Sequence, residues 1–416
     1  MRSPLLHALL PAALVSAQAD LLALLQSQPD LSTLTDLLSI ADLADALAQA
    51  TNITIIAPTN EAFQNVDPNI PEGVAVANRN VTSVTALLSN HVFRGLYPAA
   101  SVGEVPNFVQ SLLTPDFVND QQPFTNFTGG QYIGIVKNGA DVEVLSGEFA
   151  VSKVVEADIP LGENIIIHKV DTALAFGAPL QLFTARAGYT ALNGALEAVD
   201  NLGLQLGLTD DGGTAIGVSD LTVFVPMNEA FQLIGSEVLS YHVISENVIF
   251  SPSISNATVP SLQGSDLQLT VTDDGAVFVN GAKVVIPNVI LFNGVAHVID
   301  GVLNPLAPPL ERASLDASAT TSDRVAFADA TRVEALPFTS FTFAMDSQPE
   351  TILAIYSTGL AVAPANAAAT STAANMDPTR ATASGTAAAY TGAADVAKLA
   401  RGMLAGVVGG AIAVAL

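Results

Sequence analysis

Histidine is the side chain best suited to catalysis or metal binding in this chain, which has five histidines and no cysteine. Beyond the first residues the histidines form two pairs, His91 with His168 and His242 with His297. Two imidazoles could form a metal site or an acid–base couple. We favour a structural role, because no His-x-x-x-His spacing occurs and no carboxylate cluster accompanies either histidine at ligand spacing.

Aspartates follow two of these histidines. Asp171 and Asp300 lie three positions after His168 and His297. On a strand this spacing places the two side chains on opposite faces, so a direct His–Asp pair would need a turn. No nucleophile elbow or phosphate-binding motif occurs, and we interpret the acidic segments 210–213 and 273–275 as turns rather than calcium loops. We therefore predict no catalytic residue, no metal ligand and no cofactor.

The histidines belong to an internal repeat. Its first block reads Ile-Ile-Ala-Pro-Thr-Asn-Glu-Ala-Phe at 55–63 and Val-Phe-Val-Pro-Met-Asn-Glu-Ala-Phe at 223–231. Self-similarity with a period far above ~50 residues indicates two copies of one domain rather than a solenoid. Further blocks recur in the same order, 87–92 with 238–243, 152–155 with 282–285, and 167–171 with 296–300.

The first block predicts a buried strand that leads into a helix. A β-branched apolar run forms the strand, and proline ends it because proline cannot donate to a ladder. The asparagine is expected to cap the helix, the glutamate to favour its positive end, and the phenylalanine to fill the core. These roles fall on Pro58, Asn60, Glu61 and Phe63 in the first copy and on Pro226, Asn228, Glu229 and Phe231 in the second.

Two further patterns predict local structure in both copies. Asn-Gly pairs at 138–139 and 280–281, flanked by alternating apolar residues, predict hairpins. Apolar residues at helical spacing precede the first strand, over 34–47 in one copy and 189–199 in the other. The copies differ in length, since 28 positions separate Phe63 from His91 but 11 separate Phe231 from His242. The second copy therefore lacks much of the segment 66–85.

Composition limits the function. The 416 residues carry 14 Lys and Arg against 39 Asp and Glu, a formal charge of -25. Such a surface repels phosphate backbones, so we predict no nucleic-acid partner. Half of the residues are apolar, which is enough to bury a core in two or three domains. With no cysteine, packing rather than cross-links must hold each domain.

Both ends resemble processing signals. Residues 1–17 combine Arg2, a short apolar run and a small-residue cleavage pattern, as in a signal peptide, with a buried N-terminal helix as the alternative. Residues 403–416 are apolar but too short to span a bilayer, and follow small residues and a polar spacer. This is the layout of a glycosylphosphatidylinositol (GPI) attachment signal, with Gly392 as the first candidate attachment residue and Ser384 as the second. A terminal helix is the alternative.

Four Asn-x-Ser/Thr sequons offer candidate N-glycosylation sites at Asn52, Asn80, Asn126 and Asn256. Residues 363–394 are nearly all small, and such a stretch buries too little to offset its ordering entropy. We expect it to be a disordered stalk whose Ser and Thr residues accept O-glycans. Residues 306–362 contain apolar clusters without a clear period and form a poorly defined extension.

The first block, the Asn-His or Tyr-His element and the closing His-x-x-Asp element resemble the fasciclin (FAS1) domain, in two copies over about residues 20–305. Asn90, where Tyr241 stands in the second copy, departs from the family pattern. The resemblance implies an α+β fold of two tandem FAS1-like domains, each a β-wedge packed with several short helices and together followed by the stalk. We expect the divisions 1–17, 18–176, 177–305, 306–362, 363–394 and 395–416, with the last as the GPI propeptide.

The resemblance also implies a role. The order of signal, two domains, stalk and lipid tail is similar to that of fungal cell-surface fasciclin proteins, which implies adhesion and contact with extracellular matrix, cell-wall components, other surface proteins or glycans. We expect a secreted glycoprotein on the outer face of the plasma membrane, held by its lipid anchor. Two alternatives stay open, a carbohydrate- or small-ligand-binding module and, third, an enzyme that uses the paired histidines.

Overall fold

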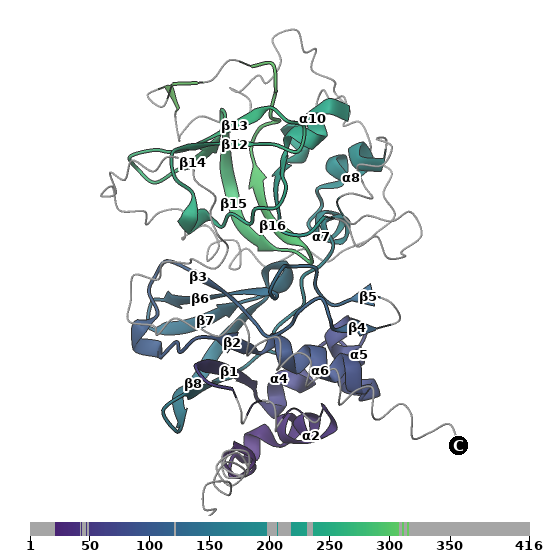
Figure 1. Cartoon of the computed structure of the whole chain (residues 1–416), viewed down its shortest axis with the longest axis vertical. Coiled ribbons are helices and arrows are strands. Elements are labelled where there is room, and N and C mark those ends of the chain that lie inside the picture. The colour runs from purple at the N-terminus through teal and green to yellow at the C-terminus, as the bar shows by residue number, and fades with distance from the viewer. Residues whose placement is uncertain are drawn as a thin grey trace, which may run out of the picture.

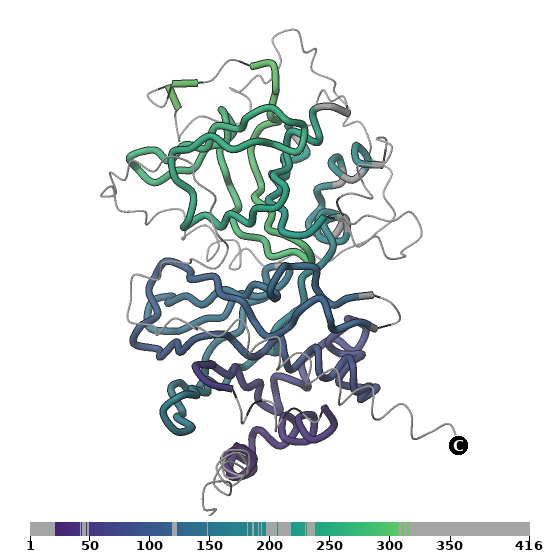
Figure 2. The backbone as a smooth tube through the Cα atoms, in the orientation of Figure 1, coloured from purple at the N-terminus to yellow at the C-terminus, as the bar shows by residue number. Residues whose placement is uncertain are grey.

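The computed structural model describes residues 21–41, 43, 47, 50–119, 122–197, 206, 218–230, 236–307, 310–311 and 314–315. The predicted signal peptide, the stalk and the candidate attachment residues Gly392 and Ser384 lie outside these residues. Two domains stand one above the other along the long axis of the molecule (Figure 1). The chain completes the first domain before it enters the second, as its colour along the backbone shows (Figure 2).

Each domain is built on one seven-stranded sheet, and the two sheets have the same strand order. The first runs β2-β1-β9-β8-β7-β6-β3 and the second β11-β10-β16-β15-β14-β13-β12. In each, the strand of the first sequence block pairs in parallel with the last strand of the domain, β1 with β9 and β10 with β16, and the other pairs are antiparallel. The predicted α+β fold of two tandem copies is confirmed.

The strands of the first sheet are β1 (Ile53–Pro58), β2 (Val92–Arg94), β3 (Asn107–Gln110), β6 (Tyr132–Asn138), β7 (Asp141–Leu145), β8 (Val151–Leu161) and β9 (Ile165–Val170). Those of the second are β10 (Leu221–Pro226), β11 (Val243–Ile244), β12 (Ala257–Pro260), β13 (Asp266–Val271), β14 (Val277–Val279), β15 (Ala282–Ile290) and β16 (Gly294–Ile299). The first domain also has a two-stranded ribbon, β4 (Val118–Asn119) with β5 (Gln122–Pro123).

Helices and 3-10 turns connect the strands, and the α-helices gather at one side of each sheet (Figure 1). In the first domain they are η1 (Pro29–Leu31), α2 (Ser32–Ala41), α4 (Asn60–Gln64), α5 (Pro71–Asn78), α6 (Val81–Asn90), η2 (Ala99–Ser101) and η3 (Gly147–Phe149). In the second they are α7 (Leu180–Arg186), α8 (Thr190–Glu197), η4 (Asn228–Ala230), α10 (Ser236–Tyr241) and η5 (Ser251–Ser253).

The first-block strand is buried on both faces, as an apolar run in a parallel pair should be. Ile53, Ile55 and Ala57 of β1 join the core beneath the helices, whereas Ile56 packs on the other side of the sheet with Phe93. Strand β10 repeats this alternation, with its odd-numbered residues facing the helices and Phe224 in the opposite core. Both strands end at their proline, as predicted.

The predicted hairpins form, but they are not counterparts in the two sheets, since 138–139 lies at the turn between β6 and β7 whereas 280–281 joins β14 and β15, which match β7 and β8. Asn280 and Gly281 are the loop between β14 and β15, and Asn280 takes the left-handed φ of 51° that such turns need. In the first domain Asn138 still pairs with Asp141, so Gly139 and Ala140 form the loop. The predicted helical spacing is borne out in part. Leu34 and Leu38 are buried on α2, and Leu192 and Leu196 are buried on α8. Helix α2 ends at Ala41 and Leu43 is not helical, so 34–47 is not one helix; Val199 lies outside the described residues.

The repeated asparagine was predicted to cap the helix that follows it, and this prediction is wrong. Thr59 caps α4, because its side chain accepts from the Ala62 N–H at 3.2 Å, and Asn60 is already the first helical residue. The Asn60 side chain reaches back instead to the junction of η1 and α2, where its Oδ1 accepts from the Thr33 N–H of α2 at 2.9 Å and its Nδ2 donates to the Pro29 carbonyl of η1 at 3.0 Å.

The second copy repeats this cross-element cap. Asn228 Oδ1 accepts from the Ala191 N–H of α8 at 3.1 Å, and its Nδ2 donates to the Gly188 carbonyl at 2.7 Å. Met227 stands where Thr59 does and offers no acceptor, and the residues after it form the 3-10 turn η4. The asparagine is therefore common to both copies because it ties the first-block segment to the preceding helix.

We expect Asn60→Ala and Asn228→Ala each to lower the free energy of unfolding by ~1 kcal/mol, the usual cost of a lost helix cap. Equilibrium urea unfolding measures this loss. Gln64→Ala, at an exposed position of α4, is the control and should leave the free energy nearly unchanged. Equal effects of Asn60→Ala and Gln64→Ala would show that the cap contributes nothing.

Candidate functional site

His91 and His242 join the end of a helix to the segment that leaves the domain. His91 accepts from the Leu174 N–H through Nε2 at 2.8 Å, while its Nδ1 lies 2.7 Å from the Leu87 carbonyl. His242 makes the same two contacts, with the Leu303 N–H at 2.9 Å and the Val238 carbonyl at 2.7 Å. Because Nε2 accepts, the single proton of each neutral ring must lie on Nδ1.

His168 and His297 use the opposite tautomer. Their Nδ1 atoms accept from the backbone N–H groups of Asp158, at 3.1 Å, and Asn288, at 3.3 Å. Their Nε2–H groups donate to the carbonyls of Tyr97 and Ile249, each at 2.8 Å. Each ring thus joins the last strand of its domain to the neighbouring strand and to the loop after β2 or β11.

The residues that face these two rings sit at matching bulges. The registers of β8 with β9 and of β15 with β16 shift where Asp158 and Asn288 occur. Both take a left-handed φ, 58° and 64°, which Asp and Asn tolerate better than most side chains. Their side-chain oxygens accept from the Ala99 and Ser251 N–H groups at 2.9 and 2.7 Å, so the bulge also fixes η2 and η5.

A buried threonine completes this arrangement, and the sequence interpretation missed it. Thr54 donates to the Gly95 carbonyl and accepts from the Tyr97 N–H, and Thr222 does the same with Asn247 and Ile249. Each threonine therefore holds the loop whose carbonyl receives the histidine proton. Its recurrence as the second residue of both first-block strands was the available signal.

Asp171 and Asp300 act on the backbone of the neighbouring strand. Asp171 Oδ1 accepts from the Lys153 N–H at 2.9 Å, and Asp300 Oδ1 accepts from the Lys283 N–H at 2.7 Å. In return the two aspartate N–H groups donate to the same lysine carbonyls. Both aspartates follow directly after the last strand of their domain, where this two-way contact secures the strand end.

Burial keeps the histidine rings neutral. The four rings are at most 2% exposed. Loss of hydration lowers the pKa of His91, His242 and His297 to about 4, although a backbone carbonyl near each ring favours the charged form. Burial likewise lowers the pKa of His168. At neutral pH the rings therefore donate and accept one hydrogen bond each, and both nitrogens are engaged by the backbone.

The remaining residues of the repeated blocks have structural positions where they are described. Phe63 is buried in the core and Glu61 is exposed in the first turn of α4. Phe231 and the side chain of Glu229 lie outside the described residues. Among the described residues no group of three or more acidic, histidine or cysteine side chains is placed to hold a metal ion.

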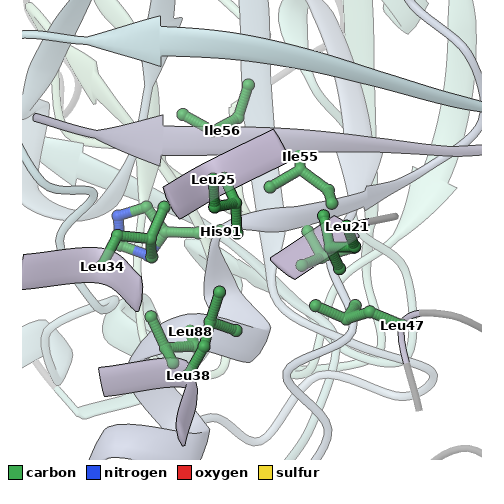
Figure 3. Close-up of a pocket in the computed structure, with 10 residues that line it drawn as sticks. Leu21, Leu25, Leu34, Leu38, Leu47, Ile55, Ile56, Leu88 and His91 are labelled. Carbon is green, nitrogen blue, oxygen red and sulfur yellow. The ribbon is translucent and has the colours of Figure 1, made fainter. Parts of the chain in front are cut away.

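A small cavity lies beside His91 in the first domain (Figure 3). Its volume is about 20 Å³, and leucines from residues 21–47 and α6 line it together with Ile55 and Ile56 of β1. A space of this size holds one water at most, and an apolar lining keeps such a void dry. The cavity is a packing defect between helices and sheet rather than a binding site.

The four sequons differ in exposure. Asn80 and Asn256 are exposed, at the start of α6 and just before β12, whereas Asn52 and Asn126 are half-buried. The Asn126 N–H donates to the Phe292 carbonyl of the other domain at 2.9 Å. Within the described part of the chain no helix is long and apolar enough to cross a membrane.

Comparisons with known proteins agree with the duplicated fold. The model of the family described as "Fasciclin domain" matches residues 29–176 and 188–305. A fasciclin-like arabinogalactan protein of Arthroderma benhamiae is 28% identical over 68% of this chain and 65% of its own length, so the match leaves about a third of that relative uncovered. One of Cercospora beticola is 29% identical over 68% of this chain and 75% of its own.

A solved structure of a FAS1 domain pair from the insect cell adhesion molecule Fasciclin I is 17% identical and covers 73% of this chain and 100% of its own, with a TM-score of 0.27.

We expect stability to fall as the pH drops from 6.5 towards 4. In this range the unfolded histidines bind protons while the folded ones, with pKa values of about 4, do not, so each favours unfolding by up to ~1.4 kcal/mol per pH unit. The measurement is the free energy of urea unfolding between pH 7 and 5. Above pH 6.5 the histidine contribution should be constant.

The variant His242→Gln tests whether a buried histidine causes this pH dependence. It should lower the free energy of unfolding at pH 7 by ~1–3 kcal/mol, because the buried Leu303 N–H loses its imidazole acceptor. It should also make the pH dependence shallower by about one proton. An unchanged pH slope would mean that His242 titrates alike in the folded and unfolded states. One metal ion per domain in the purified protein, lost with the histidine, would support the enzyme alternative instead.

Proposed function

Because this chain belongs to the fasciclin domain family, we propose that it is an extracellular adhesion glycoprotein that contacts cell-wall or matrix components through its domain surfaces, without catalysis. The observation that carries this proposal is the use of both nitrogens of every described histidine by backbone groups. The residues best suited to chemistry therefore stabilise the interior of each domain, which leaves the outer surfaces of the domains for recognition.

The names of the relatives support the proposed role in adhesion. Two are fasciclin-like arabinogalactan proteins of fungi, and the solved domain pair comes from a cell adhesion molecule. By analogy we infer that this chain works at a cell surface, against wall polymers, matrix or other surface proteins. The division into a signal peptide (1–17), two domains (18–176 and 177–305), an extension, a stalk (363–394) and a GPI propeptide (395–416) is part of the proposal.

The anchor proposal is tested on cells that express the full chain. Treatment with a phosphatidylinositol-specific lipase should release the two-domain part, because the proposed attachment at Gly392, or at Ser384, would leave a lipid as its sole link to the membrane. Immunoblotting of the medium measures release. Retention under conditions that release a known GPI-anchored control would contradict the anchor, and binding of the released protein to wall polysaccharide tests adhesion separately.

We propose that Asn80 and Asn256 carry N-glycans. Both are exposed, whereas Asn52 and Asn126 are half-buried and Asn126 lies where the domains meet. Asn80→Gln and Asn256→Gln should each reduce the mass of the secreted protein by one glycan, measured by mass spectrometry. Asn126→Gln, at the half-buried sequon where the domains meet, should leave the mass distribution unchanged; the reverse pattern would refute the assignment.

A further inference from the structure

The segment that leaves the first domain is held at three consecutive backbone N–H groups by side chains. The Leu174 N–H donates to His91, the Ala175 N–H to Ser146 Oγ at 3.0 Å, and the Phe176 N–H to a carboxylate oxygen of Glu72. The Ala175 carbonyl accepts from the Asn90 side chain at 3.2 Å and from the Gly147 N–H at 3.2 Å. We call residues 174–176 the exit segment.

Three segments that contact the exit segment are longer in the first domain than in the second. Glu72 lies on α5, within the stretch that the second copy lacks. Ser146 and Gly147 belong to the connection 146–150 between β7 and β8, where the second domain has only 280–281. The third segment, 111–131 between β3 and β6, corresponds to 261–265, and its Phe124 ring lies 5.0 Å from that of Phe176.

The next residues are fixed to the second domain without an intervening linker. The Ala178 carbonyl accepts from the Phe292 N–H at 2.8 Å, and Ala178 bridges in parallel to Leu291. A Cβ on Gly177 would lie 2.1 Å from the Leu291 carbonyl oxygen, so only glycine permits this approach. Residue 176 is therefore held by one domain and residue 177 by the other.

The segment 111–131 also reaches the second domain directly. Gln131, which is fully buried, donates to the Leu291 carbonyl at 3.3 Å, and the Asn126 N–H bonds to the next carbonyl. Between the domains, the rings of Phe108 and Phe250 also stack, with centroids 3.9 Å apart and an interplanar angle of 6°. Polar and aromatic contacts thus surround the crossing point.

The connection 146–150 inserts an aromatic ring into the core of the second domain. Phe149 is 4% exposed and meets Phe183 of α7 edge-on at 5.5 Å. Its φ of 67° is unfavourable for a bulky side chain and costs on the order of 1 kcal/mol or more. Such strain persists because the apolar contacts of the ring in the second domain offset it. The backbone of the first domain therefore adopts the conformation that this contact between the domains requires.

Residues 303–305 of the second domain correspond to the exit segment. They keep its hydrogen bond to a histidine but differ at the third residue. Leu303 donates to His242 as Leu174 does to His91. Phe176 corresponds to Pro305, which has no N–H to give to a carboxylate. The counterpart of Glu72 would fall in the stretch that the second copy lacks.

We propose that α5 and the segments 111–131 and 146–150 form a positioning device that fixes the second domain on the first, so that the two move as one body. The extra length of the first copy, α5 included, forms this positioning device. Glu72 is its positioning residue, because it joins α5 to the last residue held by the first domain.

The orientation of the domains is measured in the full chain by pulsed electron double resonance. Since the chain has no cysteine, labels can be placed uniquely at Glu104→Cys and Ser253→Cys, both exposed and one in each domain. The parent should give a single narrow distance. Glu72→Ala should lose it in favour of a broad distribution, whereas Glu72→Gln, which keeps an acceptor oxygen, should retain most of it.

Glu61→Ala is the matched control, because Glu61 is the second residue of α4 as Glu72 is of α5 but is exposed. It should leave the distance narrow. A second label pair within the first domain, Gln64→Cys with Glu104→Cys, reports unfolding. A narrow interdomain distance in Glu72→Ala, with α5 displaced or not, would overturn the role of Glu72.

A second variant covers the case in which Glu72→Ala unfolds the first domain and broadens both label pairs. Phe149→Ala removes the inserted ring and leaves α5 untouched. It should broaden the interdomain distance while the pair within the first domain stays narrow. If the interdomain distance stays narrow in Phe149→Ala, the positioning device as a whole is refuted.

Discussion

A backbone N–H bonded to a neutral imidazole closes each domain, and the rest of the architecture depends on it. The last strand of each domain enters the middle of the sheet, parallel to the first-block strand, so the residues that follow it emerge within the core. A buried donor without an acceptor costs ~1–3 kcal/mol. His91 and His242 supply the acceptor from the end of the preceding helix. Their neutrality follows from the apolar packing that this position requires.

The two copies share a framework and differ in what is attached to it. Both copies have the same strand order and a bulge residue, Asp158 or Asn288. Both also have a threonine that holds the loop next to the histidine of the last strand, and an asparagine that caps the preceding helix. Three segments that are longer in the first copy contact the chain at the boundary between the domains. The extra length of the first copy thus has an explanation inside the molecule, since these segments contact residues 174–176.

The sequence predicted the parts of the fold that depend on local patterns. The first-block strands, the hairpins at the Asn-Gly pairs and the amphipathic helices were readable because their signals lie within a few residues. The partner of Asn60 was not readable, since Thr33 lies 27 positions upstream. Nor did anything local mark Glu72, whose partner Phe176 is 104 positions away. The left-handed backbone of Phe149 contradicts its local preference and arises from packing in another domain.

The direct passage from residue 176 to residue 177 bears on how a long polymer would be held. Two sites on freely jointed domains would have to be aligned at the moment of binding, at the expense of orientational entropy. Here that alignment is made once, during folding. A polysaccharide or protein strand that touched both domains would therefore meet its second site at a high effective concentration, and weak contacts on each surface would add up to a durable attachment.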